Sequence, residues 1–271
     1  MKKIPALLVL AVILFGGLAA YLYLHRPEPR PPAVKALPHP PSPLPPQVHK
    51  EPEANVVLEA PSEHVALPPL AQSDSYMLES LAGLLGDKSL LRLFVPGTLI
   101  HNIVATVDNL PRRDSTMNVM PVKPVPGRFK VSGKGDELII SPKNARRYAP
   151  YVKLAEATNA EKLVEIYIRL YPLFQQAYEE LGYPKKYFND RLMVALDDLL
   201  AAPDIRAPVG LIRPKVFYLF ADQDLEDRSI GQRILMRTGS KNEAIIRAKL
   251  QEIRQELMRH MHEQKVEASP E

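Results

Sequence analysis

Ten polar residues lie beside apolar helical stretches and are the first candidates for a binding or catalytic surface. They are Asp108, Asn109, Asn144, Arg146, Arg147, Tyr148, Asn189, Asp190, Arg191 and Asp222. A structural role also suits these residue types, because Asp and Asn cap helices and Arg bridges carbonyls and carboxylates where helices meet. Composition and spacing leave both roles open.

Three of the arginines indicate a more specific chemistry. Arg146, Arg147 and Arg191 could converge on one anionic group, because the guanidinium fork matches the geometry of a carboxylate or a phosphate. Arg112 and Arg113 lie in a loop and could join them. This hypothesis requires that the three arginines share one pocket open to solvent.

The carboxylates indicate an alternative, a hydrolase acting on envelope glycan. A glycosidase needs two carboxylates about 5 to 10 Å apart across a cleft. Asp108, Asp190, Asp222 and Glu226 are available, but their positions along the chain do not pair any two of them. The sequence has no Gly-x-Ser-x-Gly elbow and no phosphate-binding Gly-rich loop. We therefore name no catalytic residue.

Metal and cofactor chemistry has little support in the residue types. The chain has no cysteine, which excludes thiolate metal sites, cysteine nucleophiles and disulfides. His101 is the only histidine expected within the folded core, and His260 and His262 are two residues apart, so they do not share a helix face for chelation. We expect no metal site and no cofactor.

An aromatic stripe could serve the core or a ligand. Tyr167, Tyr171, Phe174 and Tyr178 follow one another at spacings of four, three and four, which places all four on one helix face. Core packing is the favoured interpretation. The alternative is a partly exposed stacking platform for sugar rings, which Tyr183, Tyr187 and Phe188 could extend.

The first 26 residues indicate a membrane anchor. The run from Ile4 to Leu24 has no ionisable side chain, and as a helix it would be about 30 Å long, the thickness of one hydrocarbon core. Lys2 and Lys3 before it favour a cytoplasmic N-terminus. We expect residues 4–24 to cross the inner membrane once, with the rest periplasmic. A cleaved signal peptide is the alternative.

A proline-rich linker is expected over residues 27–69. This segment holds fourteen of the 28 prolines and few large apolar residues, so it cannot bury enough surface to offset the entropy of ordering. In polyproline II form, about forty residues could reach on the order of 100 Å. A spacer is the favoured role, and a Pro-rich ligand for a partner's aromatic groove is the alternative.

The remaining residues predict one compact domain over 70–264, mainly helical with a small β element (α+β), followed by a disordered tail over 265–271. Helices are predicted over 73–85, 90–107 with a break at Pro96-Gly97, 158–181, 185–201, 229–237 and 240–262, and strands over 128–131, 137–141 and 216–220. Ser73-Asp74-Ser75 is expected to cap the first helix, and Thr158 with Glu161 to form a capping box.

One long motif resembles a known family. The run from Tyr171 to Pro184, followed by Phe188-Asn-Asp-Arg191, resembles a bacterial family catalogued as a domain of unknown function, number 3014. Further similar segments are 107–111, 144–148 and 221–222. The resemblance covers most of residues 70–258. It implies a proteobacterial protein with an N-terminal membrane segment and brings no established activity.

Together these patterns predict location more firmly than activity. The formal net charge of +4 over 271 residues is too mild to indicate nucleic-acid binding. We expect a non-enzymatic binding or scaffolding module of the cell envelope, with the lipid bilayer and an envelope protein or peptidoglycan as partners. A periplasmic glycan hydrolase using a carboxylate pair stays the alternative.

Overall fold

The structure is a computed structural model that describes residues 66–114, 120–205 and 208–267. The expected membrane segment 4–24 and nearly all of the expected linker lie outside these residues. Within the described ranges, none of the helices combines the length and the apolar character that crossing a bilayer requires. The fold is mainly helical with a few short strands, as the sequence predicts.

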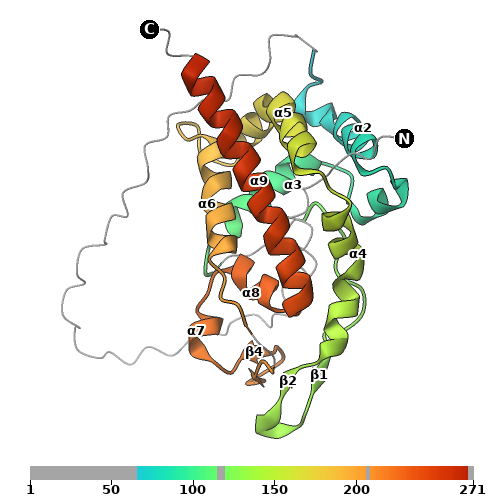
Figure 1. Cartoon of the computed structure of the whole chain (residues 1–271), viewed down its shortest axis with the longest axis vertical. Helices are drawn as coiled ribbons and strands as arrows, with labels where there is room; N and C mark the ends of the chain where they lie inside the picture. Colours follow the sequence, from blue (N-terminus) through green and yellow to red (C-terminus); the bar gives the residue numbers. More distant parts are fainter. Residues whose placement is uncertain (1–65, 115–119, 206–207, 268–271) are drawn as a thin grey trace, which may run out of the picture.

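Eight α-helices make up most of the described chain (Figure 1). They are α2 (Ser73–Leu85), α3 (Leu99–Asn109), α4 (Ala145–Glu156), α5 (Ala160–Glu180), α6 (Phe188–Leu200), α7 (Gln223–Glu226), α8 (Ile230–Met236) and α9 (Ser240–Glu267). Four short 3-10 helices accompany them: η1 (Leu70–Gln72), η2 (Lys88–Leu93), η3 (Gly135–Glu137) and η4 (Pro142–Asn144). The sequence did not predict α4, and α9 extends to Glu267, past the predicted end at His262 and into the predicted tail.

Two small antiparallel hairpins form the β part of the described chain. Strand β1 (Val131–Ser132) pairs with β2 (Ile139–Ile140), and β3 (Leu211–Ile212) pairs with β4 (Leu219–Phe220). The backbone N–H of Leu211 donates to the Leu138 carbonyl at 2.7 Å, which joins the two hairpins. A small core of Leu211, Phe220 and Met236 lies beneath them.

Helix α9 lies along the molecule and packs against α4, α5 and α6 (Figure 1). Its side chains Ile246, Leu250, Ile253 and Leu257 are buried at spacings of four, three and four residues, as expected for one helix face. Helix α5 is covered on another side by α3, whose Leu99, Ile103 and Val107 are also buried. The main core is therefore the apolar volume between α3, α5, α6 and α9.

Two of the predicted helix caps, the one at residues 73–75 and the capping box of Thr158 with Glu161, are wrong. The side chain of Asp74 accepts hydrogen bonds from the backbone N–H groups of Gly97 and Leu99, so it caps α3 rather than its own helix. The cap of α5 is Asn159, whose Oδ1 accepts from the Lys162 N–H at 3.0 Å. Thr158 instead donates to the Leu154 carbonyl of α4. The packing of α2 on α3 thus places a carboxylate of α2 at the start of α3.

The start of α8 is held tightly against the loop that follows α3. The N–H of Gly231 donates to the Leu110 carbonyl at 2.9 Å, and the N–H of Ile230 donates to the Arg112 carbonyl at 2.8 Å. A Cβ atom on Gly231 would lie 2.7 Å from the Leu199 Cδ2 methyl and 3.2 Å from the Leu110 carbonyl oxygen. Both leucines are buried, so neither can easily yield.

We therefore expect Gly231→Ala to lower the free energy of unfolding by about 1 kcal/mol through overpacking, despite the better helix propensity of alanine. Gly83→Ala is the matched control, because Gly83 lies inside α2 with nothing within 4 Å of its Cβ position. It should raise stability by up to about 1 kcal/mol. Urea unfolding of the full chain in mild detergent measures both. Equal effects would contradict the proposed crowding at Gly231.

Helix α8 is also tied to α6 by Asp198. Its carboxylate accepts hydrogen bonds from Ser229 Oγ at 2.6 Å and from Gln232 Nε2 at 3.2 Å. Burial raises the pKa of Asp198 above its ordinary value, and the hydrogen bond from Ser229 offsets only part of this effect. A carboxylic acid with a raised pKa in the folded chain binds more protons there than in the unfolded chain.

Stability from this group should therefore be greatest at low pH and fall as pH rises from near 3.8 through the raised pKa. In Asp198→Asn the side chain does not titrate, and its single carbonyl oxygen can still accept one of the two hydrogen bonds. The stability of the natural chain relative to this variant should decrease as pH rises across that window, measured by urea unfolding at a series of pH values. A difference that stays constant or grows with pH would contradict the assignment.

Candidate functional site

A buried carboxylate at the end of α3 organises the most polar surface of the domain. Only 7% of the Asp108 side chain is exposed. Its Oδ2 lies 2.6 Å from Arg112 Nη2, and its Oδ1 lies 3.0 Å from Arg191 Nε. The Tyr183 hydroxyl donates to Oδ2 at 3.3 Å. One carboxylate is thus neutralised by two guanidinium groups, which is the condition for burying its charge.

Each arginine also binds the backbone at the end of α3. Arg191 donates to the Asp108 carbonyl, and so does Arg112 Nε, at 3.1 Å. Cations are favoured at this end of a helix because its last carbonyls lack partners within the helix. Partial burial opposes the charge of Arg112, but Asp108 and Tyr183 outweigh it and raise the pKa of Arg112 above its ordinary value. The pair therefore joins α3 to α6 as well as holding Asp108.

The aromatic stripe supports this cluster from inside the core. Tyr167, Tyr171, Phe174 and Tyr178 are between 1% and 4% exposed, so the core interpretation is confirmed and no sugar ring can stack on them. Burial raises the pKa of Tyr167 well above its ordinary value. The Tyr183 ring stacks on Tyr178 with centroids 4.7 Å apart, which places the Tyr183 hydroxyl at Asp108.

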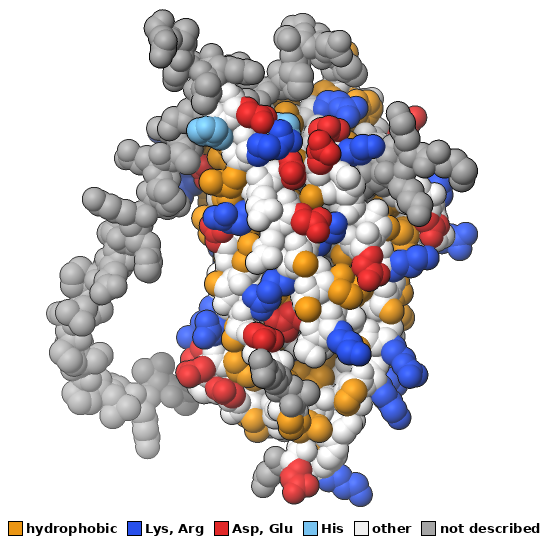
Figure 2. Space-filling model, in the orientation of Figure 1, with side chains coloured by type: hydrophobic (Ala, Val, Ile, Leu, Met, Phe, Trp, Pro, Cys, Tyr) orange, Lys and Arg blue, Asp and Glu red, His pale blue; other side chains and the backbone are white. Residues whose placement is uncertain are grey.

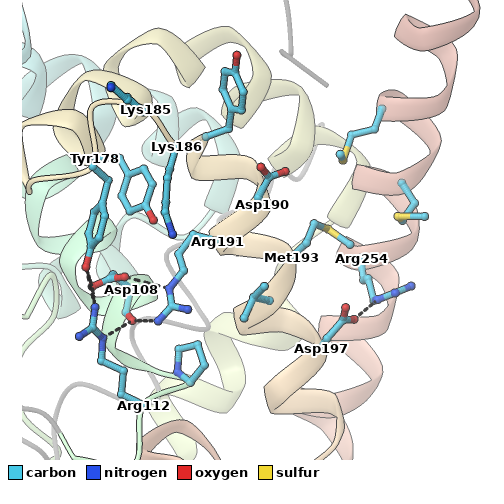
Figure 3. A pocket seen from close by; sticks show the side chains of 16 residues that line it. Asp108, Arg112, Tyr178, Lys185, Lys186, Asp190, Arg191, Met193, Asp197 and Arg254 are labelled. Atoms are coloured by element: carbon cyan, nitrogen blue, oxygen red, sulfur yellow. Dashed lines mark hydrogen bonds and ion pairs between the residues drawn. The ribbon is translucent and has the colours of Figure 1, made fainter. Parts of the chain in front are cut away.

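A groove of about 870 Å³ runs across the outer side of α6, between the end of α3 and the C-terminal half of α9 (Figure 3). We call it the α6 groove. Its lining comprises Asp108, Pro111, Arg112, Tyr178, Tyr183, Lys185, Lys186, Tyr187, Asp190, Arg191, Met193, Val194, Asp197, Arg254, Met258 and Met261. This volume falls within the usual size of ligand sites.

The two sides of the α6 groove differ in chemistry. On one side Arg112 and Arg191 flank Asp108, with Lys185 and Lys186 above them (Figure 3). On the other side α9 contributes three lining residues, Arg254, Met258 and Met261, which come four and three residues apart and so share one helix face. Arg254 Nε pairs with Asp197 Oδ1 at 2.5 Å, and both side chains of this pair are at least 36% exposed. The groove is cationic at one side and largely aliphatic at the other.

The three arginines expected to share one pocket are not brought together. Arg191 lines the α6 groove, whereas Arg146 and Arg147 do not. Arg147 donates to the carbonyls of Pro126 and Gly127, at 3.1 and 2.6 Å, and so fixes the segment before the first hairpin. Arg146 is exposed on α4. Arg112 is the arginine that accompanies Arg191, because it follows Asp108 by one helical turn.

The other predicted residues serve the fold. Asn144 is buried and bonds both backbone groups of Lys130, which fastens the first hairpin to α4. Asn189 accepts from the Tyr167 hydroxyl, and Asn109 donates to the Ala105 carbonyl of its own helix. The remaining two are Tyr148, which is fully buried, and Asp222, which caps α7 through the Asp224 N–H. Asp190, in the first turn of α6, does line the groove.

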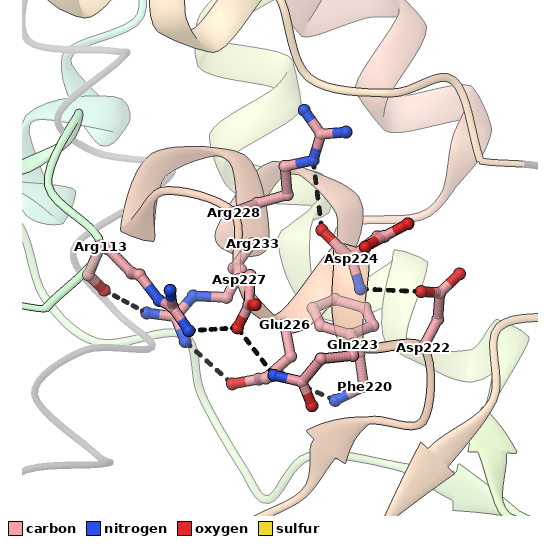
Figure 4. Close-up of polar contacts among 9 residues, drawn as sticks. All are labelled: Arg113, Phe220, Asp222, Gln223, Asp224, Glu226, Asp227, Arg228 and Arg233. Atoms are coloured by element: carbon pink, nitrogen blue, oxygen red, sulfur yellow. Dashed lines mark hydrogen bonds and ion pairs between the residues drawn. The ribbon is translucent and has the colours of Figure 1, made fainter. Parts of the chain in front are cut away.

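A second polar cluster surrounds Glu226 and is structural (Figure 4). Glu226 Oε1 accepts from Arg233 Nη1 at 2.8 Å, and Oε2 accepts from the Phe220 N–H at 2.8 Å. Arg233 also donates to the Arg113 carbonyl at 2.7 Å. Arg237 lies buried over the Phe220 ring, 4.4 Å from its centroid, and burial lowers its pKa from the ordinary value. These bonds join the second hairpin to α8.

The lining residues on α9 were not identified from the sequence as functional. Met261 follows Leu257 by four residues and continues the apolar stripe of α9, whereas Met258 lies beside that stripe on the face of Arg254. Which neighbouring helix that stripe faces depends on packing. In the described ranges no cluster of three or more His, Cys, Asp or Glu side chains could hold a metal ion.

The arrangement defines a helical domain with a surface groove and paired charges. Residues 99–254 match the family described as "Protein of unknown function (DUF3014)", and the chain belongs to this family. The matched segment includes Asp108, Arg112, Arg191 and Arg254, while Met258 and Met261 follow it. No curated protein and no solved structure matches the chain.

Removing the charge of Asp108 should destabilise the domain, because two guanidinium groups would lose their shared counter-charge. We expect Asp108→Asn to lower the free energy of unfolding by about 2 kcal/mol, less than for a wholly buried pair because Arg112 is 42% exposed. Asp197→Asn breaks the exposed pair with Arg254 and should cost less than about 0.5 kcal/mol. Urea unfolding compares the two, and equal losses would contradict this role for Asp108.

Proposed function

We propose that the protein is a non-enzymatic binding or scaffolding module of the cell envelope that binds its partner in the α6 groove. An inner-membrane anchor over residues 4–24 and a proline-rich spacer would hold the domain in the periplasm. The observation that carries the proposal is the groove itself. It combines an apolar wall with cationic groups, and its most buried carboxylate, Asp108, is already neutralised.

The same charges argue against the alternative of a glycan hydrolase. A general acid in a glycosidase needs a raised pKa, and a nucleophile needs a carboxylate free to reach the substrate. Asp108 is enclosed by two arginines, and Glu226 lies outside the groove, paired with Arg233. Asp222 is engaged as a helix cap. Of the two other carboxylates that line the groove, Asp190 and Asp197, the second is paired with Arg254. Binding therefore fits the described residues better than hydrolysis.

The expected anchor and spacer support a role in which position matters. A proline-rich segment resists compaction and extends further per residue than a flexible linker. Holding a binding groove at a distance from the bilayer raises its local concentration near a partner in the envelope. An enzyme acting on a diffusible substrate would gain little from such an arrangement.

Deletion of residues 31–61 should therefore impair binding without affecting the fold. We expect the deletion variant to unfold at the same temperature as the natural chain and to give a lower yield of crosslinked partner in cells. The matched control replaces residues 31–61 with an equally long proline-rich sequence of different order, which keeps the reach. An undiminished yield of crosslinked partner from the deletion variant would contradict the spacer role. A lower yield from the control would indicate that the proline-rich segment is itself a sequence-specific ligand.

The choice between binding and hydrolysis is tested by in-cell crosslinking of the tethered domain, followed by identification of what it holds. We expect a bound envelope component and no glycan-degrading activity from the purified full chain. Asp190→Asn is the decisive variant, because Asp190 is a carboxylate in the first turn of α6 that lines the groove. Glycan-degrading activity that this variant abolishes would overturn the proposal.

A further inference from the structure

We infer that the ligand of the α6 groove is an amphipathic helix of a partner protein, with acidic residues beside its apolar stripe. This inference rests on the proposed binding function and adds the chemical class of the partner. It is drawn from three features of the groove: exposed aliphatic side chains, methionine chemistry and an excess of positive charge.

The aliphatic side of the groove is exposed to an extent that calls for a partner. Val194 is 39% exposed and Met258 is 47% exposed, and both are among the few large apolar side chains on the described surface with this exposure. Met193 and Met261 are partly buried beside them and line the same groove. Helices α6 and α9 pack side by side and form its walls. A surface between two packed helices accepts the apolar stripe of a third.

Methionine side chains in a binding surface favour a protein partner over the rigid ring of a sugar. Three of the four aliphatic lining residues just named are methionines, whose unbranched thioether chains adapt to partners of irregular shape. A glycan ligand would instead require exposed aromatic faces for stacking. Tyr178 is 3% exposed and is covered by Tyr183, whose hydroxyl is committed to Asp108 and Arg112. The partly exposed rings that line the groove are those of Tyr183 and Tyr187, and they are outnumbered by its four aliphatic side chains. The groove therefore favours a peptide over a sugar.

The positive charge of the groove indicates that the partner carries negative charge. Five of its lining residues are Lys or Arg and three are Asp, and Asp108 contributes little to the surface because only 7% of its side chain is exposed. On the face seen in Figure 2, basic and acidic side chains are interspersed. Complementary charge at the rim of an apolar contact steers association and fixes orientation. Acidic residues flanking an apolar stripe meet this requirement.

The test begins with a photoreactive amino acid placed at Val194 or Met258 of the full chain in the cells that produce it. Ile212 and Val216, which are 46% and 51% exposed and lie outside the groove, are the control positions. We expect adducts when the photoreactive residue is at either groove position, and no adducts when it is at either control position. The captured segment should be acidic, with apolar residues at intervals of three and four.

A synthetic peptide of the captured segment then tests the contacts, using fluorescence anisotropy with the full chain in mild detergent. Lys185→Glu combined with Lys186→Glu should weaken binding about tenfold through two charge reversals. Lys143→Glu combined with Lys241→Glu is the matched control, because both side chains are exposed and lie outside the groove. Val194→Asp should also weaken binding about tenfold, compared with Val216→Asp.

The outcomes separate this inference from the proposed function. An adduct with peptidoglycan, or with a second copy of this chain, would overturn the helical partner and leave the binding function standing. A captured segment that is basic, or whose binding the lysine reversals do not weaken, would overturn the charge argument and with it the inference. No adduct at Val194 or Met258 in cells where the protein works normally would overturn both.

Discussion

The need to neutralise Asp108 constrains how the helices meet. A carboxylate this far from water is tolerated only with a counter-charge at hydrogen-bonding distance. Arg112 supplies one from the next turn of the chain, and Arg191 supplies the other from α6. The backbone carbonyl of Asp108 is bound by the same two side chains. The end of α3, the loop after it and the outer side of α6 are therefore held in one arrangement, and the groove lies on that arrangement.

The same interaction bears on function. Two arginines that could bind an anion are partly committed to Asp108, and a carboxylate that could do acid–base chemistry is committed to them. What is left at the surface is a modest excess of positive charge beside the exposed side chains of Met258 and Val194 and two partly buried methionines. Such a surface is suited to holding a macromolecular partner, with specificity from charge and contact area from aliphatic side chains. The polar residues around α7 have a different role, because Glu226 of α7 is bonded to α8 and to β4.

Several sequence predictions depended on local patterns and were confirmed. The helix predicted over 73–85 is α2, and the aromatic spacing in α5 correctly indicated a buried face. The caps were less predictable. Packing places Asp74 at the start of α3, and local backbone geometry makes Asn159, rather than the adjacent Thr158, the cap of α5. Helix α4 was missed, since Pro150 lies inside it and its apolar content is low. Whether residues 4–24 cross a membrane stays a prediction outside the described residues.

The sequence by itself determined the helical class, the family motif from Tyr171 to Pro184, and the apolar faces of α5 and α9, because these follow from residue spacing along one element. Only the tertiary structure decided that Arg191 joins Arg112 rather than Arg146 and Arg147, and that Met258 faces the same groove as Val194. The reason is physical. Periodicity fixes which side chains share a helix face, but the approach of two faces depends on the packing of side chains distant in the chain and on the neutralisation of buried charge.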